Sequence, residues 1–248
     1  MKKVLYLIVR SGLCNRLRSL VSGICLSEEL QCSLFVYWPS FKVESAAAFD
    51  SLYRLSSLPH WVIVIDAVSP QKKIRCDTKE EAQQAFINGL TIISNAHFHK
   101  TDTKRFNRHI RNLLPIQKIL SRVNNNLNRV PLGYMPIGVH IRRTDNIKAI
   151  EESPLSGFVQ AMQKIKDGYF FLATDDRAIA SVLKKKFTGR LHCHETIRRR
   201  DTLEGMQEAM VSLYTLAGCS FILGCNGSSF SGQAATIGNK KIKRVGYG

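Results

Sequence analysis

Short apolar runs rich in β-branched and aromatic residues recur along the chain, and amphipathic segments lie between them. Continuous apolar runs of this length fit strands that are buried on both faces of a parallel sheet, and the periodic segments fit helices. The predicted strands are residues 4–9, 33–38, 61–66, 90–94, 137–141, 169–173, 190–193, 221–225 and 242–245. The predicted helices are residues 16–30, 78–88, 105–126 with a break at Pro115, 154–165, 177–187, 202–217 and 231–237. This alternation predicts an α/β protein.

Pro131, Gly133 and Pro136 punctuate the chain after the predicted helix that ends in Asn124-Asn125-Asn126. Turn-forming residues in such a cluster are typical of a boundary between structural units. With 248 residues the chain is long enough for one large or two compact domains. We therefore predict two Rossmann-like, doubly wound parallel-sheet domains, residues 1–130 and 131–248, with a cleft between them.

The composition is that of a globular protein, with 44% hydrophobic and 22% charged residues. It excludes a disordered chain, a collagen-like fibre and a disulfide-rich miniprotein. The apolar run at residues 4–9 is shorter than the roughly 7–15 residues of a signal-peptide core, so we interpret it as a buried strand. The seven cysteines are odd in number and form no Cys-x-x-Cys motif, which favours free thiols in a reducing compartment. A cytoplasmic location is the expectation.

The formal net charge is +17, and residues 100–129, 184–200 and 240–244 hold the whole surplus. Concentrated positive charge attracts polyanions: nucleic acid, an anionic membrane surface or a phosphorylated small substrate. Charge alone does not choose among these partners, and solvated helix faces also explain such segments. Peripheral membrane association through the basic segments is one expectation that they raise.

Three of the predicted strands in the second half are followed directly by polar residues. These are His140-Ile141-Arg142-Arg143-Thr144-Asp145, Thr174-Asp175-Asp176 and Asn226-Gly227-Ser228-Ser229-Phe230-Ser231. In open α/β sheets ligands bind beyond the carboxyl ends of the strands, so these groups should converge on one edge. Paired arginines bind phosphate bidentately, a turn at a helix N-terminus attracts anions, and a carboxylate accepts the paired N–H donors of guanine. Together they predict a nucleoside diphosphate site.

Each group taken singly has a structural explanation. Arg142 and Arg143 could be a surface pair, Asp175 and Asp176 a helix cap with its neighbour, and residues 228–231 a capping turn. Their recurrence after three successive predicted strands favours the binding site. In the first half, Ser11-Gly12-Leu13-Cys14-Asn15-Arg16 follows the first predicted strand, but the chain contains neither a P-loop nor a Gly-x-Gly-x-x-Gly fingerprint. ATP hydrolysis through a Walker loop and NAD-type redox chemistry are therefore disfavoured.

Four motifs, in this order, resemble those of the GDP-fucose-dependent fucosyltransferase superfamily: Gly12-Leu13-Cys14-Asn15-Arg16, His140-Ile141-Arg142-Arg143-Thr144-Asp145, Ala173-Thr174-Asp175-Asp176 and Ser228-Ser229-Phe230-Ser231. The superfamily includes α1,6-, α1,2- and protein O-fucosyltransferases. The second and third motifs resemble the α1,6 branch, and the fourth resembles the α1,2 branch. The resemblance spans almost the whole chain and is strongest over residues 138–238.

The resemblance implies a GT-B architecture and an inverting transfer of fucose from GDP-fucose to a hydroxyl of a glycan or other acceptor, with no cofactor and no required metal. By the same resemblance, Arg142 binds the β-phosphate, His140 and Arg143 flank the nucleotide, and Asp175 or Asp176 binds guanine. Ser228, Ser229 and Ser231 contact the pyrophosphate. Asn15, with Arg16 beside it, faces the donor sugar from the other domain.

One departure from the family pattern concerns the catalytic base. The glutamate that serves as base in α1,6 enzymes would fall at Ala149 or Ile150, and neither side chain can accept a proton. Glu151, Glu152 and Asp145 are the nearby carboxylates, and we name Glu151 and Asp145 as candidates beside Arg142 as catalytic residues.

Metal ligands form no strong pattern in the sequence. There is no Asp-x-Asp motif, and His192-Cys193-His194 and His97-Phe98-His99 lack further ligands at zinc spacing, so no metal site is predicted. Two other classes of function remain open at this point. One is a basic α/β protein that binds nucleic acid, which is the less favoured partner, and the other is a family member that binds GDP-sugar without transferring it.

Overall fold

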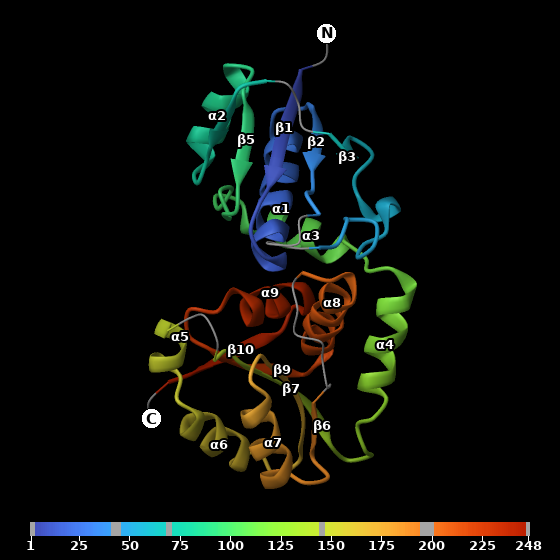
Figure 1. Cartoon of the computed structure of the whole chain (residues 1–248), viewed down its shortest axis with the longest axis vertical. Coiled ribbons are helices and arrows are strands. Elements are labelled where there is room, and N and C mark those ends of the chain that lie inside the picture. Colours follow the sequence, from blue (N-terminus) through green and yellow to red (C-terminus); the bar gives the residue numbers. More distant parts are fainter. Residues whose placement is uncertain (1–2, 41–45, 68–70, 144–146, 194–200, 247–248) are drawn as a thin grey trace. The chain divides into compact units, whose positions relative to one another are not determined.

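The computed structural model describes residues 3–40, 46–67, 71–143, 147–193 and 201–246. The backbone divides into two compact units, each built on its own sheet (Figure 1). Unit 1 comprises Met1–Ile116 and Arg199–Gln207, and unit 2 comprises Gln117–Arg198 and Glu208–Gly248. The predicted α/β fold with two parallel sheets is confirmed.

The division between the units comes before helix α4 (Gln117–Leu127), whereas the sequence predicted it at residues 130 and 131. This helix lies with unit 2 because it packs against α8 (Leu203–Gly218). Asn126 Nδ2 donates a hydrogen bond to Thr215 Oγ1 at 3.1 Å, and Arg122 forms an ion pair with Glu208. The prolines and glycine at 131–136 therefore mark the entry into the first strand of unit 2.

Unit 1 contains a five-stranded parallel sheet in the order β3-β2-β1-β5-β4. Its strands are β1 (Val4–Val9), β2 (Ser33–Tyr37), β3 (Val62–Ile65), β4 (Lys73–Arg75) and β5 (Thr91–Ser94). Helix α1 (Leu13–Glu29) packs on β1 and β2, α2 (Lys79–Ile87) packs on β5, and α3 (Thr103–Asn112) packs on α1. A short 3₁₀ helix covers Leu55–Ser57.

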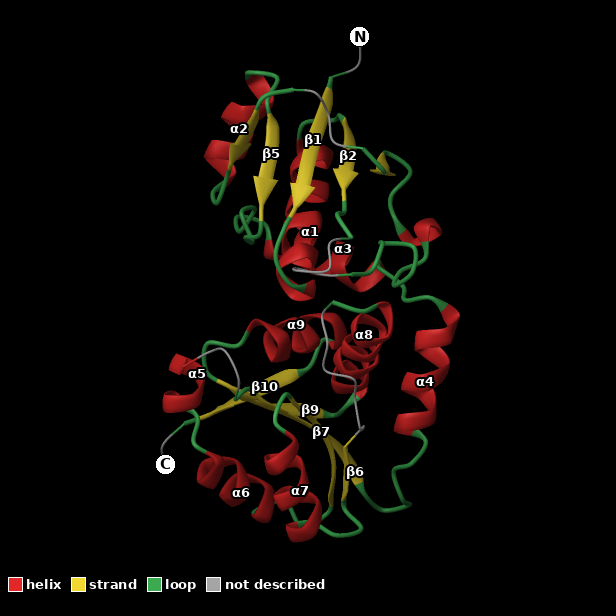
Figure 2. Ribbon diagram, in the orientation of Figure 1, coloured by secondary structure: helices red, strands yellow, loops and turns green. Residues whose placement is uncertain are grey.

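Unit 2 contains a second five-stranded parallel sheet, in the order β10-β9-β6-β7-β8. Figure 2 shows strands of this sheet in yellow and the helices of the unit in red. Its strands are β6 (Met135–Ile141), β7 (Gly168–Thr174), β8 (Leu191–Cys193), β9 (Phe221–Cys225) and β10 (Lys241–Val245). Its remaining helices are α5 (Ile147–Glu152), α6 (Leu155–Gln163), α7 (Arg177–Lys186) and α9 (Ser229–Gly238).

Helices cover both faces of the unit 2 sheet, as the continuous apolar strands predicted. On one face, Val139 of β6 lies in a core with Phe158 of α6 and Leu183 of α7. On the other face, Gly138 leaves room for α8, because a Cβ at this position would lie 2.9 Å from the side chain of Leu216. Because helices cover both faces, a ligand can reach polar groups of this sheet only at the two ends of its strands.

Three short elements were not predicted, and one of them is the 3₁₀ helix at Leu55–Ser57. Strand β4 has three exposed residues and so lacks an apolar run, and α5 has only six residues. The predicted helix at 105–126 is two helices, α3 and α4, separated at Pro115 as expected. Among the described residues, no helix has the length and apolar character needed to span a bilayer.

Candidate active site

The carboxyl ends of β6, β7 and β9 meet at one edge of the unit 2 sheet, which we call the site edge. Strand β6 pairs with β7 on one side and with β9 on the other. The chain order reverses between β6 and β9, since β7 and β8 extend the sheet in one direction and β9 and β10 in the other. Ligands of open α/β sheets bind outside the carboxyl ends at such a switch point. The three polar segments picked out in the sequence follow these three strands.

One carboxylate joins the segments that follow β6 and β7. Asp175 Oδ2 lies 3.1 Å from Arg142 Nε, and Asp175 Oδ1 accepts a hydrogen bond from the Arg143 backbone N–H at 2.7 Å. The side chains of Arg142 and Asp175 are only 21% and 17% exposed, so water screens this pair less than a surface ion pair. The predicted convergence of the segments after β6 and β7 is confirmed.

Ser153, which the sequence analysis did not single out, links the segments after β6 and β9. Its side chain is fully buried, and its Oγ accepts a hydrogen bond from the Asn226 backbone N–H at 2.8 Å. Its backbone carbonyl accepts a hydrogen bond from Arg143 Nη2 at 2.7 Å. Beside it, Cys225 Sγ accepts a hydrogen bond from the Arg142 backbone N–H at 3.3 Å. A single serine ahead of a proline carries no sequence signal for such a role.

Helix α9 begins at the site edge, directly after β9. Gly227 has a φ of +65°, which suits the tight turn between the two elements. Ser228 is the N-cap residue, and its side chain makes no capping hydrogen bond. The first N–H groups of a helix have no partner within the helix and carry partial positive charge, so they attract anions. The start of α9 can therefore bind an anionic group of a ligand.

Arg244 of β10 holds the start of α9 in place. Its Nη1 donates hydrogen bonds to Ser231 Oγ at 2.9 Å and to the Cys225 carbonyl at 2.6 Å. Gly224 is required for this contact, since a Cβ there would lie 2.6 Å from Ser231 Oγ. Ser231 is completely buried, Ser228 is buried and Ser229 is partly exposed. The hydroxyl of Ser231 therefore serves the packing of α9, and ligand contacts by Ser228 and Ser229 stay predictions.

His140 lies on the face of β6 that packs against α9. Its ring stacks on Phe230 with a centroid distance of 5.0 Å, and its Nδ1 has no hydrogen-bond partner among the described residues. Burial, with a smaller contribution from the charge of Arg142, lowers the pKa of His140 from 6.5 to about 3. The ring is therefore neutral at neutral pH. The same burial makes this nitrogen inaccessible from outside, so a nucleotide contact by His140 stays a prediction.

Asp176 is the N-cap residue of α7. Its Oδ1 accepts hydrogen bonds from the backbone N–H groups of Ala178 and Ile179 at 2.8 and 3.1 Å. Of the two carboxylates, Asp175 thus uses both oxygens on the arginine segment, and Asp176 uses Oδ1 on its own helix. Asp176 can therefore cap α7 and still bind guanine, and its guanine contact stays a prediction.

In unit 1, the segment after β1 is built around a buried arginine. Arg16 Nε donates a hydrogen bond to the Ser11 carbonyl at 2.7 Å, Nη1 donates to the Pro39 carbonyl, and the guanidinium lies 5.5 Å from the Trp38 ring. Ser11 has a φ of +71°, a conformation that is uncommon for a residue other than glycine. Asn15 is partly buried, and its Nδ2 donates to Ser11 Oγ at 3.3 Å. Arg16 therefore holds the turn together, and donor contacts by Arg16 and Asn15 stay predictions.

Comparisons with known proteins identify the fold. No protein-family profile and no curated protein matches the sequence. Among solved structures, NodZ α1,6-fucosyltransferase soaked with GDP-fucose matches with a TM-score of 0.69 and 19% identity, over 94% of this chain and 92% of that one. POFUT1 in complex with GDP-fucose matches with a TM-score of 0.67 and 10% identity, over 100% of this chain and 99% of that one. The chain has the fold of the GDP-fucose fucosyltransferases. The fold that the four motifs implied is confirmed.

The candidate bases of this fucosyltransferase fold lie on or before α5. Glu151 is exposed on α5, two residues before Ser153, and Glu152 is partly exposed. Asp145 and Thr144 lie outside the described residues. The choice of Glu151 or Asp145 as base stays a prediction.

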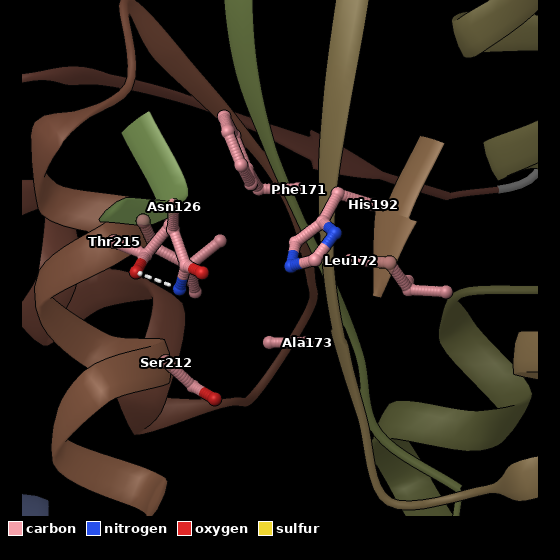
Figure 3. Close-up of a pocket in the computed structure, with 8 residues that line it drawn as sticks. Asn126, Phe171, Leu172, Ala173, His192, Ser212 and Thr215 are labelled. Atoms are coloured by element: carbon pink, nitrogen blue, oxygen red, sulfur yellow. Dashed lines mark hydrogen bonds between the residues drawn. The ribbon is translucent and has the colours of Figure 1, made fainter. Parts of the chain in front are cut away.

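A small pocket with both polar and apolar lining residues lies beside the carboxyl ends of β7 and β8 (Figure 3). It is lined by Asn126, Phe171, Leu172, Ala173, His192, Ser212, Thr215 and Leu216. Its volume of about 20 Å³ has room for about one water molecule. Figure 3 shows Asn126 and Thr215, joined by their hydrogen bond, on the opposite side of the pocket from His192.

In the sequence, His192 stood out only as a potential metal ligand, together with His194. Within the described part of the chain, no group of three or more His, Cys, Asp or Glu side chains is placed to hold a metal ion, and His194 lies outside that part.

Proposed function

We propose that the protein is a glycosyltransferase that transfers L-fucose from GDP-fucose to a hydroxyl group of a glycan or other acceptor. The observation that carries this proposal is the site edge, where Arg142, held by Asp175, shares one switch point with the start of α9. Guanidinium groups and helix N-termini bind phosphate oxygens, so the site edge suits a diphosphate. NodZ was soaked with GDP-fucose and POFUT1 was solved in complex with it, which supports the choice of donor.

In the proposed complex, the donor diphosphate lies between Arg142 and the start of α9. Asp175 orients Arg142 through its carboxylate, and Ser153 fixes Arg143 and the end of β9. Because these partners are already in place, the arginine loses little freedom when the ligand binds. Asp176 then contacts the guanine, where it selects the base, and the buried ring of His140 supports the start of α9 through Phe230.

The proposed reaction is an inverting displacement. The acceptor oxygen forms a bond to the anomeric carbon while the bond from that carbon to the β-phosphate oxygen breaks, and GDP leaves with the electron pair. The acceptor proton passes to a carboxylate, for which Glu151 is our candidate. Negative charge grows on the β-phosphate as the bond breaks, and a positioned guanidinium and helix N–H groups stabilise it. Arg142 is thus the proposed catalytic residue on the leaving-group side, and the reaction as proposed requires no metal or cofactor.

We propose a reducing compartment, the cytoplasm, as the location. All seven cysteines lie in the described part of the chain, as buried thiols rather than disulfides. Burial raises the pKa values of Cys25 and Cys219 to about 12, so both thiols stay protonated and weakly reactive. Structural thiols of this kind are typical of proteins from reducing compartments.

A thermal-shift panel tests the donor assignment, with GDP, GDP-fucose, GDP-mannose, UDP and ADP as ligands. A ligand at 100 times its dissociation constant adds about 2.7 kcal/mol to the free energy of unfolding. We expect a rise in the melting temperature with GDP and GDP-fucose and little change with UDP or ADP. Release of GDP from GDP-fucose, followed in the same samples, tests turnover. Equal shifts with all five ligands, or no shift with any, would contradict the proposal.

A further inference from the structure

The opposite edge of unit 2, at which β6, β7 and β8 begin, carries a dense group of basic side chains. We call it the basic edge and define it by the turns before these strands, with the last three residues of α7 included: residues 128–134, 164–168 and 184–190. Its cations are Arg129, Lys164, Lys166, Lys184, Lys185, Lys186 and Arg190, and Asp167 is the one acid in these turns. Strands of seven residues such as β6 span about 23 Å, so the basic edge is separate from the site edge.

Arg190 ties the three turns into one surface. Its Nε donates a hydrogen bond to the Gly168 carbonyl at 3.1 Å, and its guanidinium lies 6.0 Å from the ring of Tyr134. Its backbone carbonyl accepts a hydrogen bond from the Phe170 N–H at 2.7 Å. Figure 1 shows the turns that enter β6 and β8 at the same end of unit 2. The lysines on these turns therefore belong to one surface.

Leu132 is fully exposed at the tip of the turn before β6. The turn is closed by a hydrogen bond from the Tyr134 N–H to the Pro131 carbonyl at 3.1 Å, and Gly133 has a φ of +85°. A rigid turn holds this leucine out from the protein, next to Tyr134, which is itself 39% exposed. A single exposed leucine is common on protein surfaces, but Leu132 and Tyr134 lie together among cations, and this combination fits a partner that takes up both kinds of group.

We propose that the basic edge binds the surface of a bilayer that contains anionic phospholipids. Lysines near an anionic leaflet are attracted by its surface potential, while an apolar tip and an aromatic ring enter the interface between headgroups and acyl chains. Nucleic acid is the less suitable partner, because a phosphate backbone attracts the lysines but offers Leu132 no apolar environment. The proposal uses no residue of the site edge and holds whether or not the protein transfers fucose.

Co-sedimentation of the full chain with vesicles tests the proposal. The vesicles contain either phosphatidylcholine alone or phosphatidylcholine with about 30% phosphatidylserine, which provides the anionic surface. We expect binding to the anionic vesicles and little to the neutral ones. Each cation near such a surface changes the partition roughly fivefold, so Lys166→Glu, Lys185→Glu and Lys186→Glu together should weaken binding by about 100-fold or more.

A matched control carries the same change of net charge elsewhere: Lys72→Glu, Lys73→Glu and Lys104→Glu, all at exposed positions of unit 1. It should keep most of the vesicle affinity, and both triple variants should keep the thermal unfolding midpoint. Equal losses in the two triple variants would show a general charge effect and overturn the proposal. Equal binding to neutral and anionic vesicles would overturn it as well.

Leu132→Ser separates a bilayer from nucleic acid. Loss of an inserted leucine should weaken vesicle binding roughly fivefold or more, with no change in affinity for a duplex oligonucleotide. If Leu132→Ser leaves vesicle binding unchanged while Lys166→Glu, Lys185→Glu and Lys186→Glu abolish oligonucleotide binding, the basic edge is a nucleic-acid surface and the membrane proposal is wrong.

Discussion

The Nε atom of Arg142 lies 3.1 Å from Oδ2 of Asp175, although the two residues follow different strands. The other oxygen of the same carboxylate accepts the Arg143 backbone N–H at 2.7 Å. Asp175 therefore fixes both the side chain of one arginine and the backbone of the next. A site that binds charge works best when its groups are oriented before the ligand arrives, because the reaction then requires no reorganisation.

Replacement of Arg142 by alanine should lower turnover more than it weakens donor binding. Its guanidinium gains interaction as charge grows on the departing diphosphate, and removal of one such donor typically costs on the order of 10²–10³ in turnover. Arg142→Lys should recover little of this loss, because an ammonium group lacks the planar, bidentate fork. Single-turnover release of GDP and the dissociation constant for GDP-fucose, measured on the same variants, check the two effects separately.

Arg129→Ala is the matched control for Arg142, since Arg129 is an exposed arginine at the basic edge of the same unit. It should leave turnover on soluble substrate unchanged. A folded Arg142→Ala protein with turnover close to that of the unmodified chain would refute the site assignment.

The two carboxylates after β7 should respond differently to replacement by asparagine. Asp175→Asn should weaken GDP and ADP alike by roughly 10- to 100-fold, because hydrogen bonds to charged groups are worth about 1.5–3 kcal/mol and Arg142 loses its partner. Asp176→Asn should keep the helix stable, since asparagine is an equally good N-cap residue. The preference for GDP over ADP should fall by roughly one to two decades in Asp176→Asn, if its carboxylate pairs with the two N–H donors of guanine. Titration calorimetry with both nucleotides distinguishes these outcomes, and an unchanged preference in both variants would remove the guanine assignment.

His140 should make the protein less stable as the pH falls. The unfolded chain protonates this histidine near pH 6.5, whereas burial keeps the folded-state pKa at about 3. Between these values the unfolded state binds more protons, so the free energy of unfolding decreases by at most about 1.4 kcal/mol per pH unit from this residue. Urea unfolding at about pH 7.5 and pH 5 measures the decrease, of which His140 should contribute about 2 kcal/mol.

His140→Gln tests this contribution because it removes the titrating group. The decrease in stability between the two pH values should be smaller in this variant, whereas His60→Gln, at an exposed position, should leave it unchanged. The same decrease in all three proteins would show that other groups cause the acid sensitivity.

Transfer should survive removal of divalent cations. This expectation rests on the lack of an Asp-x-Asp motif in the sequence and on the arginines at the site edge. Their positive charge can neutralise the diphosphate, as a divalent metal ion does in other enzymes. Fucose transfer or donor hydrolysis in excess EDTA, compared with the same reaction in manganese, measures it. Complete loss in EDTA with recovery in manganese would contradict the expectation.

The sequence predicted the elements that have their own local signal. Apolar runs predicted every described strand except β4, whose three residues are all exposed because it lies at the edge of the sheet. The periodic patterns predicted α2 and α7, and the structure adds their local start signals: a capping box of Thr78 and Glu81 in α2 and the N-cap Asp176 in α7. The order of strands in each sheet was not predicted, since it depends on contacts between residues far apart in the chain.

The candidate site was predicted only as far as strand ends reveal it. Arg142, Asp175 and Ser228 follow strands that proved to be neighbours, so their convergence could be inferred from the rule for parallel sheets. Ser153 reaches the site edge from the end of α5, and Arg244 reaches it from the outermost strand, β10. The residues next to them in the sequence give no sign of these contacts. Arg16 was expected at a ligand, which stays a prediction; its hydrogen bonds to the Ser11 and Pro39 carbonyls could not be predicted, because only the folded chain brings these groups together.

The strand order of unit 1 has a consequence for synthesis on the ribosome. Strand β5 lies between β1 and β4, yet it leaves the ribosome after β4. Until residue 94 has emerged, β4 has no strand to pair with, and one side of β1 stays unpaired at Leu7, Ile8 and Val9, which later pair with β5. An unpaired, apolar strand edge is a template for aggregation. A pause in translation between β3 and β5 would therefore prolong the stage at which the nascent chain is most prone to aggregate. A chaperone would be needed during that interval.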